Sequence, residues 1–154
     1  MKVILYIQSL ILSGGVVFAW FTVFGDFGRF FNAGHTITTL TGCTPPNPLI
    51  TPCFYGAIAF LIALGWSINI LLANDNKKAR SQKKLNYLLI AGTLFAWGNV
   101  AYEFYKFFKA TTEEYIGCSG QLVSHPFETA CFIGASIYLL ALITSLIILK
   151  INKK

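Results

Sequence analysis

Four cysteines are the residues of this chain with the most specific chemistry. Cys43 and Cys53 belong to one polar segment between apolar runs, and Cys118 and Cys131 belong to a second. An even number of cysteines outside a membrane is typical of disulfide bonds. Four cysteines allow three pairings, and the internal repeat described below favours Cys43 with Cys53 and Cys118 with Cys131. Each bond would tie a loop to the next helix and stabilise the fold by about 3 kcal/mol.

The same sulfurs could instead exchange electrons. Outward-facing cysteine pairs near helix ends are similar to the layout of the disulfide-bond-forming and vitamin K epoxide reductase families. The similarity implies a thiol–disulfide oxidoreductase that uses a quinone. Cys53 and Cys131 are then the expected reactive thiols, because each begins a helix whose N-terminal dipole favours a thiolate. The chain departs from these families because its pairs are separated by nine and twelve residues instead of forming Cys-x-x-Cys.

Zinc binding is a third use of cysteine together with histidine. His125 lies between Cys118 and Cys131, and His35 precedes Cys43. Zinc sites usually contain closely spaced Cys-x2-4-Cys pairs, which this chain lacks. We therefore expect no metal site, and we expect both histidines to lie on wet loop surfaces.

Two oppositely charged pairs occupy matching places in the chain. Asp26 precedes Arg29, and Glu103 precedes Lys106, each at a spacing that allows pairing along a helix surface. Acids near a membrane interior also invite a functional hypothesis, in which Asp26 and Glu103 share a proton or bind a cation. We expect structural ion pairs at the membrane surface, because each acid has its own basic partner.

The elements that position these residues are apolar helices. A chain of 154 residues that is 55% hydrophobic and 12% charged has more apolar surface than one water-soluble core can bury. Four segments have the roughly 20 apolar residues that a membrane span needs. They run from about Val3 to Phe24, Cys53 to Ala73, Leu85 to Tyr105 and Ala130 to Lys150. The sequence predicts an all-α integral membrane protein, a bundle of four transmembrane helices with small disulfide-stapled outer caps.

The basic residues predict the orientation of these helices. Nine of the twelve Lys and Arg residues lie at the two termini or between the second and third spans. Lys and Arg accumulate in cytoplasmic segments, so we expect both termini in the cytoplasm and the cysteine loops outside the cytoplasmic membrane. The net charge of +6 is therefore a signal of topology and does not predict nucleic-acid binding.

The second half of the chain repeats the first. At an offset of 77 residues Phe18-Ala19-Trp20 matches Phe95-Ala96-Trp97, and the two charged pairs match each other. At an offset of 78, Cys53-Phe54-x-Gly56-Ala57 matches Cys131-Phe132-x-Gly134-Ala135. The chain is thus predicted to contain two parallel hairpin repeats, 1–76 and 77–154, related by a pseudo-twofold axis along the membrane normal.

Small residues predict where the helices meet. Gly15 with Ala19, and Gly92 with Ala96, place two small residues on one face of the first and third helices. Helices in lipid associate closely where such residues let backbones approach. We therefore expect a close crossing of these two helices.

No sequence motif points to a known catalytic reaction. The chain lacks a phosphate-binding loop and the usual serine nucleophile motifs. The expected function is a non-catalytic structural, assembly or interaction role, with the lipid bilayer and other membrane proteins as partners and no cofactor. The quinone-linked oxidoreductase is the first alternative, and a small transporter is the second.

Overall fold

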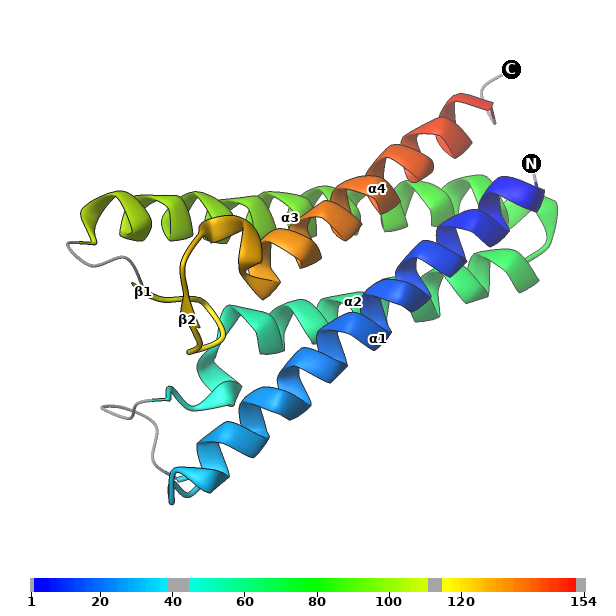
Figure 1. Cartoon of the computed structure of the whole chain (residues 1–154). Coiled ribbons are helices and arrows are strands. Elements are labelled where there is room, and N and C mark those ends of the chain that lie inside the picture. Colours follow the sequence, from blue (N-terminus) through cyan, green and yellow to red (C-terminus); the bar gives the residue numbers. More distant parts are fainter. Residues whose placement is uncertain (1, 39–44, 111–114, 152–154) are drawn as a thin grey trace.

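The computed structural model describes residues 2–38, 45–110 and 115–151. The described chain is mostly helical (Figure 1). Its long helices are α1 (Lys2–Asn32), α2 (Pro52–Leu72), α3 (Asp75–Lys109) and α4 (Ala130–Ile151). Short 3-10 helices, η1 (Pro48–Ile50) and η2 (Pro126–Glu128), precede α2 and α4. Strands β1 (Tyr115–Ile116) and β2 (Leu122–Val123) form an antiparallel hairpin in which Tyr115 lies opposite Val123.

Three of the helices are long and apolar enough to cross a membrane. They cover Val3–Asn32, Pro52–Leu72 and Ala130–Ile151. Large apolar side chains on their outer faces are exposed, including Leu10 and Phe21. Such exposure on long apolar helices is compatible with a multi-pass membrane protein. Helix α3 differs because its first turns are charged and polar.

Two helices extend well beyond the predicted spans. Helix α1 continues to Asn32 instead of ending near Phe24, and α3 begins at Asp75 instead of near Leu85. No proline interrupts either extension, so both helices continue through the polar residues. As a result, Asp26 and Arg29 lie on α1. Glu103, inside the predicted third span, and Lys106, just after it, lie on α3.

The four helices pack as two antiparallel pairs joined side by side. Helix α1 lies against α2 and α4, and α3 lies against α4 and α2 (Figure 1). The buried core between them contains large apolar side chains from every helix. These include Leu12, Phe60, Ile70, Leu85, Leu89 and Ile148.

The predicted close crossing of α1 and α3 through their glycines is wrong. A side chain at Gly15 would collide with the ring of Phe60 on α2, and one at Gly92 would collide with the ring of Tyr138 on α4. Each glycine therefore makes room for an aromatic ring of its hairpin partner. Phe60 and Tyr138 meet each other, with ring centroids 4.1 Å apart. Helices α1 and α3 are accordingly not among the helix pairs in extensive contact.

Polar side chains connect the helices at the end of the molecule where the N-terminus lies. The Gln82 amide donates hydrogen bonds to Gln8 Oε1 and to Ser145 Oγ, both at 3.1 Å. The Ser9 and Ser67 hydroxyls lie 2.7 Å apart. Hydrogen bonds of this kind hold apolar helices in register where lipid offers no polar partner.

Candidate functional site

Three cysteine sulfurs gather at the other end of the helices. Cys118 and Cys131 form a disulfide bond, as the sequence predicts. The Sγ of Cys53 lies 3.8 Å from the Sγ of Cys118. All three sulfurs lie within 4.8 Å of one another. We call Cys53, Cys118 and Cys131 the sulfur triad.

The predicted bond between Cys43 and Cys53 cannot be placed in this site. Cys43 lies outside the described residues. Among the described residues Cys53 is a free cysteine. In the part of the chain that the structure describes, a thiol thus lies beside a disulfide, and the bond between Cys43 and Cys53 stays a prediction.

Two matching helix entries position Cys53 and Cys131. Pro48 and Pro126 each begin a 3-10 turn, and Thr51 and Thr129 end it. The hydroxyl of each threonine donates a hydrogen bond to the carbonyl of the preceding proline, at 2.8 and 2.7 Å. Each cysteine is then the second residue of its helix. Both sulfurs are therefore held on rigid backbone at the same level of the molecule.

Cys118 reaches the triad from the turn of the β hairpin. The Gly117 amide donates to the Gln121 carbonyl at 2.8 Å, which closes the turn around Cys118. Gly120 has φ 71°, a conformation that favours glycine. A side chain there would also collide with Pro46. The turn is thus pressed against the polar segment that leads into α2.

Two buried carboxylates lie near the sulfur triad. Asp26 is 4% exposed and Glu103 is 2% exposed. The predicted ion pairs are present, Asp26 with Arg29 and Glu103 with Lys106, the latter at 2.7 Å. One oxygen of each carboxylate has no hydrogen-bond partner among the described residues. Both carboxylates are near enough to Cys53 to interact electrostatically with its sulfur.

The β hairpin lies directly on both ion pairs. Arg29 donates to the Ser119 carbonyl at 3.4 Å, and Lys106 donates to the Ile116 carbonyl at 2.9 Å. With its amide oxygen turned toward Arg29, Gln121 accepts from the same guanidinium at 2.6 and 2.9 Å. The charged pairs therefore hold the hairpin that carries Cys118. They have more partners than the simple surface pairs that we expected.

Tyr115 closes this polar region from the hairpin side. Its side chain is buried. Burial, followed by the neighbouring Glu103 carboxylate and then Glu128, raises the pKa of the Tyr115 phenol to about 12. The phenol therefore stays protonated at every physiological pH.

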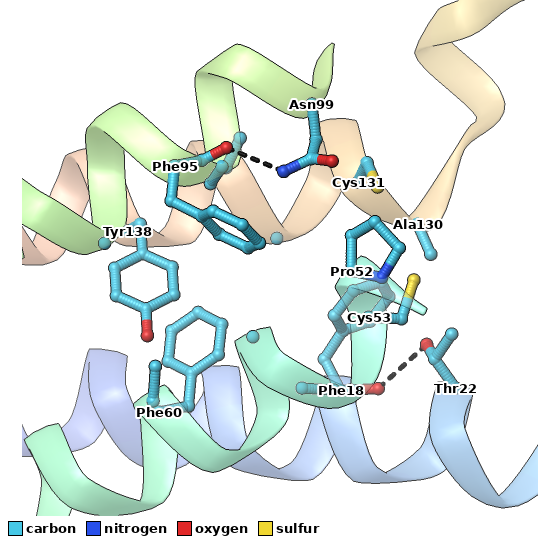
Figure 2. Close-up of a pocket in the computed structure, with 17 residues that line it drawn as sticks. Phe18, Thr22, Pro52, Cys53, Phe60, Phe95, Asn99, Ala130, Cys131 and Tyr138 are labelled. Carbon is cyan, nitrogen blue, oxygen red and sulfur yellow. Dashed lines mark hydrogen bonds between the residues drawn. The ribbon is translucent and has the colours of Figure 1, made fainter. Parts of the chain in front are cut away.

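An apolar pocket of about 60 Å³ extends from the sulfurs along the helices. Figure 2 shows Cys53 and Cys131 at one end and Phe60 with Tyr138 at the other. Its lining draws on all four helices and includes Ala19 and Ala96. These two alanines, predicted as direct packing residues, thus border a space between the helices.

Neither histidine joins the sulfur cluster. His125 Nδ1 accepts a hydrogen bond from the Phe127 amide at 3.4 Å and caps η2. His35 packs on the ring of Phe30. Among the described residues, the group of side chains close enough to hold a metal consists of the three cysteines. Neither histidine is a member of that group.

Sequence reasoning missed the approach of Cys53 to Cys118, because it paired cysteines within each repeat. The matching Pro-x-x-Thr-x-Cys entries were the available signal, since they place Cys53 and Cys131 at equivalent positions. A scan against models of protein families and searches of curated proteins and of solved structures found no match. What the site does is therefore inferred from its geometry.

Proposed function

We propose that the chain is a membrane thiol–disulfide oxidoreductase whose reacting group is the sulfur triad. The observation that carries this proposal is the 3.8 Å distance between the Cys53 sulfur, which has no disulfide partner among the described residues, and the Cys118 sulfur of a disulfide. Disulfides exchange by attack of a thiolate on a disulfide sulfur, so a thiol in contact with a disulfide is the minimal reactant pair. A purely structural staple has no use for such a thiol.

The proposed setting is a bundle of four transmembrane helices made of two parallel hairpins, 1–76 and 77–154. Matching contacts support the repeat, since Phe60 covers Gly15 in one hairpin and Tyr138 covers Gly92 in the other. The matching helix entries support it as well. The fourth span is the apolar part of α3, 85–105, whose polar residues are few and partly hidden between helices.

The proposed orientation puts the sulfur triad on the extracytoplasmic side of the cytoplasmic membrane. Basic residues crowd the opposite end, at the N-terminus, the start of α3 and the end of α4. Disulfides form and persist on the extracytoplasmic side. The site would therefore face the compartment where dithiol substrates need oxidation.

The first step is an internal exchange. As the Cys53 thiol gives its proton to a carboxylate, its sulfur attacks Cys118 Sγ, a bond forms between these two sulfurs, and the bond to Cys131 breaks. The electron pair leaves on the Cys131 sulfur, which takes up the proton that Cys53 gave up. No electrons are gained or lost in this step. The resting sulfurs form a triangle, so the Cys53 side chain must rotate to bring its sulfur into line with the bond that breaks.

The complete reaction also needs a substrate and an electron acceptor. An external dithiol reduces the Cys53–Cys118 disulfide and becomes a disulfide itself, which leaves all three cysteines of the triad as thiols. A lipid quinone, the acceptor of the alternative function predicted from the sequence, then takes two electrons and two protons from two of these thiols. They form a disulfide again, and the quinone becomes a quinol. The apolar pocket that begins at Cys53 and Cys131 is the proposed place of approach for the quinone ring. The sum is one dithiol and one quinone converted to one disulfide and one quinol.

Asp26 and Glu103 are the proposed proton acceptors. Each has a buried oxygen without a hydrogen-bond partner among the described residues, and each carboxylate interacts electrostatically with Cys53. Transfer of the thiol proton to a carboxylate avoids a free thiolate in an apolar site, which is costly. Arg29 and Lys106 would hold the two carboxylates in place.

The test is oxidation of a dithiol peptide by the purified chain in lipid nanodiscs with a short-chain quinone. Reduction of the quinone is followed by its absorbance, and disulfide formation by mass. We expect activity that is lost in Cys53→Ser and kept in Ser119→Ala, a hydroxyl next to the triad that takes no part. No quinone-dependent oxidation in the unaltered chain would overturn the proposal and favour the structural role predicted from the sequence.

A further inference from the structure

A second cavity lies far from the sulfurs, between the end of α4 and the first half of α3. It has a volume of about 550 Å³. Its walls include Lys83, Asn86 and Tyr87 of α3 and Leu146, Leu149 and Lys150 of α4. Figure 1 shows the end of α4 diverging from α3 near the N-terminus of the chain. We call this cavity the basic groove.

The basic groove is positively charged. Lys83 and Lys150 lie on opposite walls, and both are exposed. Among the described residues neither has an ion-pair partner, and no acidic side chain lines the cavity. Two ammonium groups facing one space attract an anion that both can contact.

One buried polar group in the groove lacks a partner. Asn86 is 8% exposed, and its side-chain oxygen has no hydrogen-bond partner among the described residues. A buried amide oxygen without a partner costs free energy unless a ligand or water supplies a donor. The oxygen is covered in this structure, so a hydroxyl on the ligand would supply that donor once the Asn86 side chain turns toward the groove.

The rest of the groove is apolar. Leu146 is 48% exposed, and Leu149 is half-buried beside it. Both lie on α4 inside a segment apolar enough to cross a membrane. The groove therefore joins a cationic, hydrogen-bonding end to an apolar wall that faces lipid.

We propose that the basic groove binds an anionic glycerophospholipid whose headgroup carries hydroxyls, such as phosphatidylglycerol. Lys83 and Lys150 contact the phosphate, Asn86 accepts from a headgroup hydroxyl, and the acyl chains follow Leu146 and Leu149. Basic pockets between membrane helices on the cytoplasmic side are suited to such lipids. The inference rests on the proposed membrane topology and is independent of the thiol chemistry.

The test compares lipid retention by native mass spectrometry after release from mixed micelles of phosphatidylglycerol and phosphatidylcholine. The unaltered chain is expected to retain phosphatidylglycerol preferentially. The double variant Lys83→Gln with Lys150→Gln should bind it about 30-fold more weakly, since each lysine contributes on the order of a fivefold effect. The matched control, Lys77→Gln with Lys84→Gln, removes equal charge outside the groove. It should lose much less affinity for phosphatidylglycerol.

Further measurements distinguish phosphatidylglycerol from other ligands that carry a phosphate. Asn86→Leu should lower the preference for phosphatidylglycerol over phosphatidic acid, which lacks the headgroup hydroxyls, and this readout does not depend on the lysines. Millimolar inorganic phosphate should not displace the lipid. The proposal would be overturned if both double variants lost the same affinity for phosphatidylglycerol. It would also be overturned if the unaltered chain retained phosphatidylcholine as well as phosphatidylglycerol. The groove variants should keep the dithiol oxidation activity, so failure here is distinguishable from failure of the proposed function.

Discussion

The sulfur of Cys53 lies 3.8 Å from that of Cys118, although 65 positions separate the two residues in the chain. Cys118 is at the same time bonded to Cys131. This contact joins the start of α2 to the β hairpin of the second half. It gathers three cysteines into one group with the composition that thiol–disulfide exchange needs.

The carboxylates beside the triad should set the rate of exchange. Replacing both, Asp26→Asn with Glu103→Gln, keeps the side-chain shapes but removes the proton acceptors. We expect the rate of dithiol oxidation to fall by about 100-fold, the usual contribution of a positioned acid or base. Each single variant should lose less, because the other carboxylate remains.

The control for this experiment is Glu128→Gln, an acid of η2 outside the ion pairs with Arg29 and Lys106. Its rate should stay near that of the unaltered chain. Stopped-flow measurements over a range of pH should also show that the pH dependence of the rate changes only when Asp26 or Glu103 is replaced. A double variant with the unaltered rate and pH profile would remove these carboxylates from the mechanism.

The two glycines that receive aromatic rings should be intolerant of substitution. In Gly92→Ala the added methyl group would lie 2.6 Å from the ring of Tyr138, so the ring must move. We expect a loss of about 1–3 kcal/mol in the free energy of unfolding, the usual cost of overpacking. Unfolding in mixed micelles of increasing denaturing detergent measures the change.

Gly98 on the same helix is the matched control. A side chain there meets nothing within 4 Å. Gly98→Ala should therefore be neutral or stabilise the helix by about 0.5–1 kcal/mol, because alanine loses less backbone entropy. If both alanine variants have the same stability, the packing of Tyr138 on Gly92 is not as described.

Stability should fall in strong alkali because of Tyr115. Its pKa is raised to about 12, mainly by burial, from an ordinary value near 10. Between these values the unfolded chain releases the phenol proton while the folded chain keeps it, so stabilisation that is complete below pH 10 is lost as pH rises toward 12. Tyr115→Phe should lose less stability across this window than the unaltered chain.

This alkaline loss is checked by thermal unfolding at several values between pH 9 and pH 12. Tyr87→Phe, which removes an exposed phenol on α3, is the control and should keep the profile of the unaltered chain. If Tyr115→Phe loses stability as steeply as the unaltered chain over this pH range, another group causes the loss.

The helices and one disulfide could be predicted from the sequence, because they depend on local patterns. Apolar runs of sufficient length indicated the four helices, and the repeat indicated the bond between Cys118 and Cys131. The i, i+3 spacing indicated both ion pairs. Helix ends were predicted less well, since polar residues continue α1 to Asn32.

The contacts between helices could not be predicted in the same way. Gly15 and Gly92 were predicted to let two helices cross closely. A small residue admits an aromatic ring equally well, and the choice depends on the size of Phe60 and Tyr138 on other helices. The approach of Cys53 to Cys118 depends on how the β hairpin folds over the helices, which no spacing along the chain encodes.

The most direct test of the account is the cysteine state of the double variant Cys43→Ser with Cys131→Ser. This chain keeps only Cys53 and Cys118. After mild oxidation in nanodiscs, alkylation and peptide mass mapping should show a disulfide between Cys53 and Cys118. Both cysteines alkylated in a folded protein would contradict the account, because the thiol would then not reach the sulfur that it is proposed to attack.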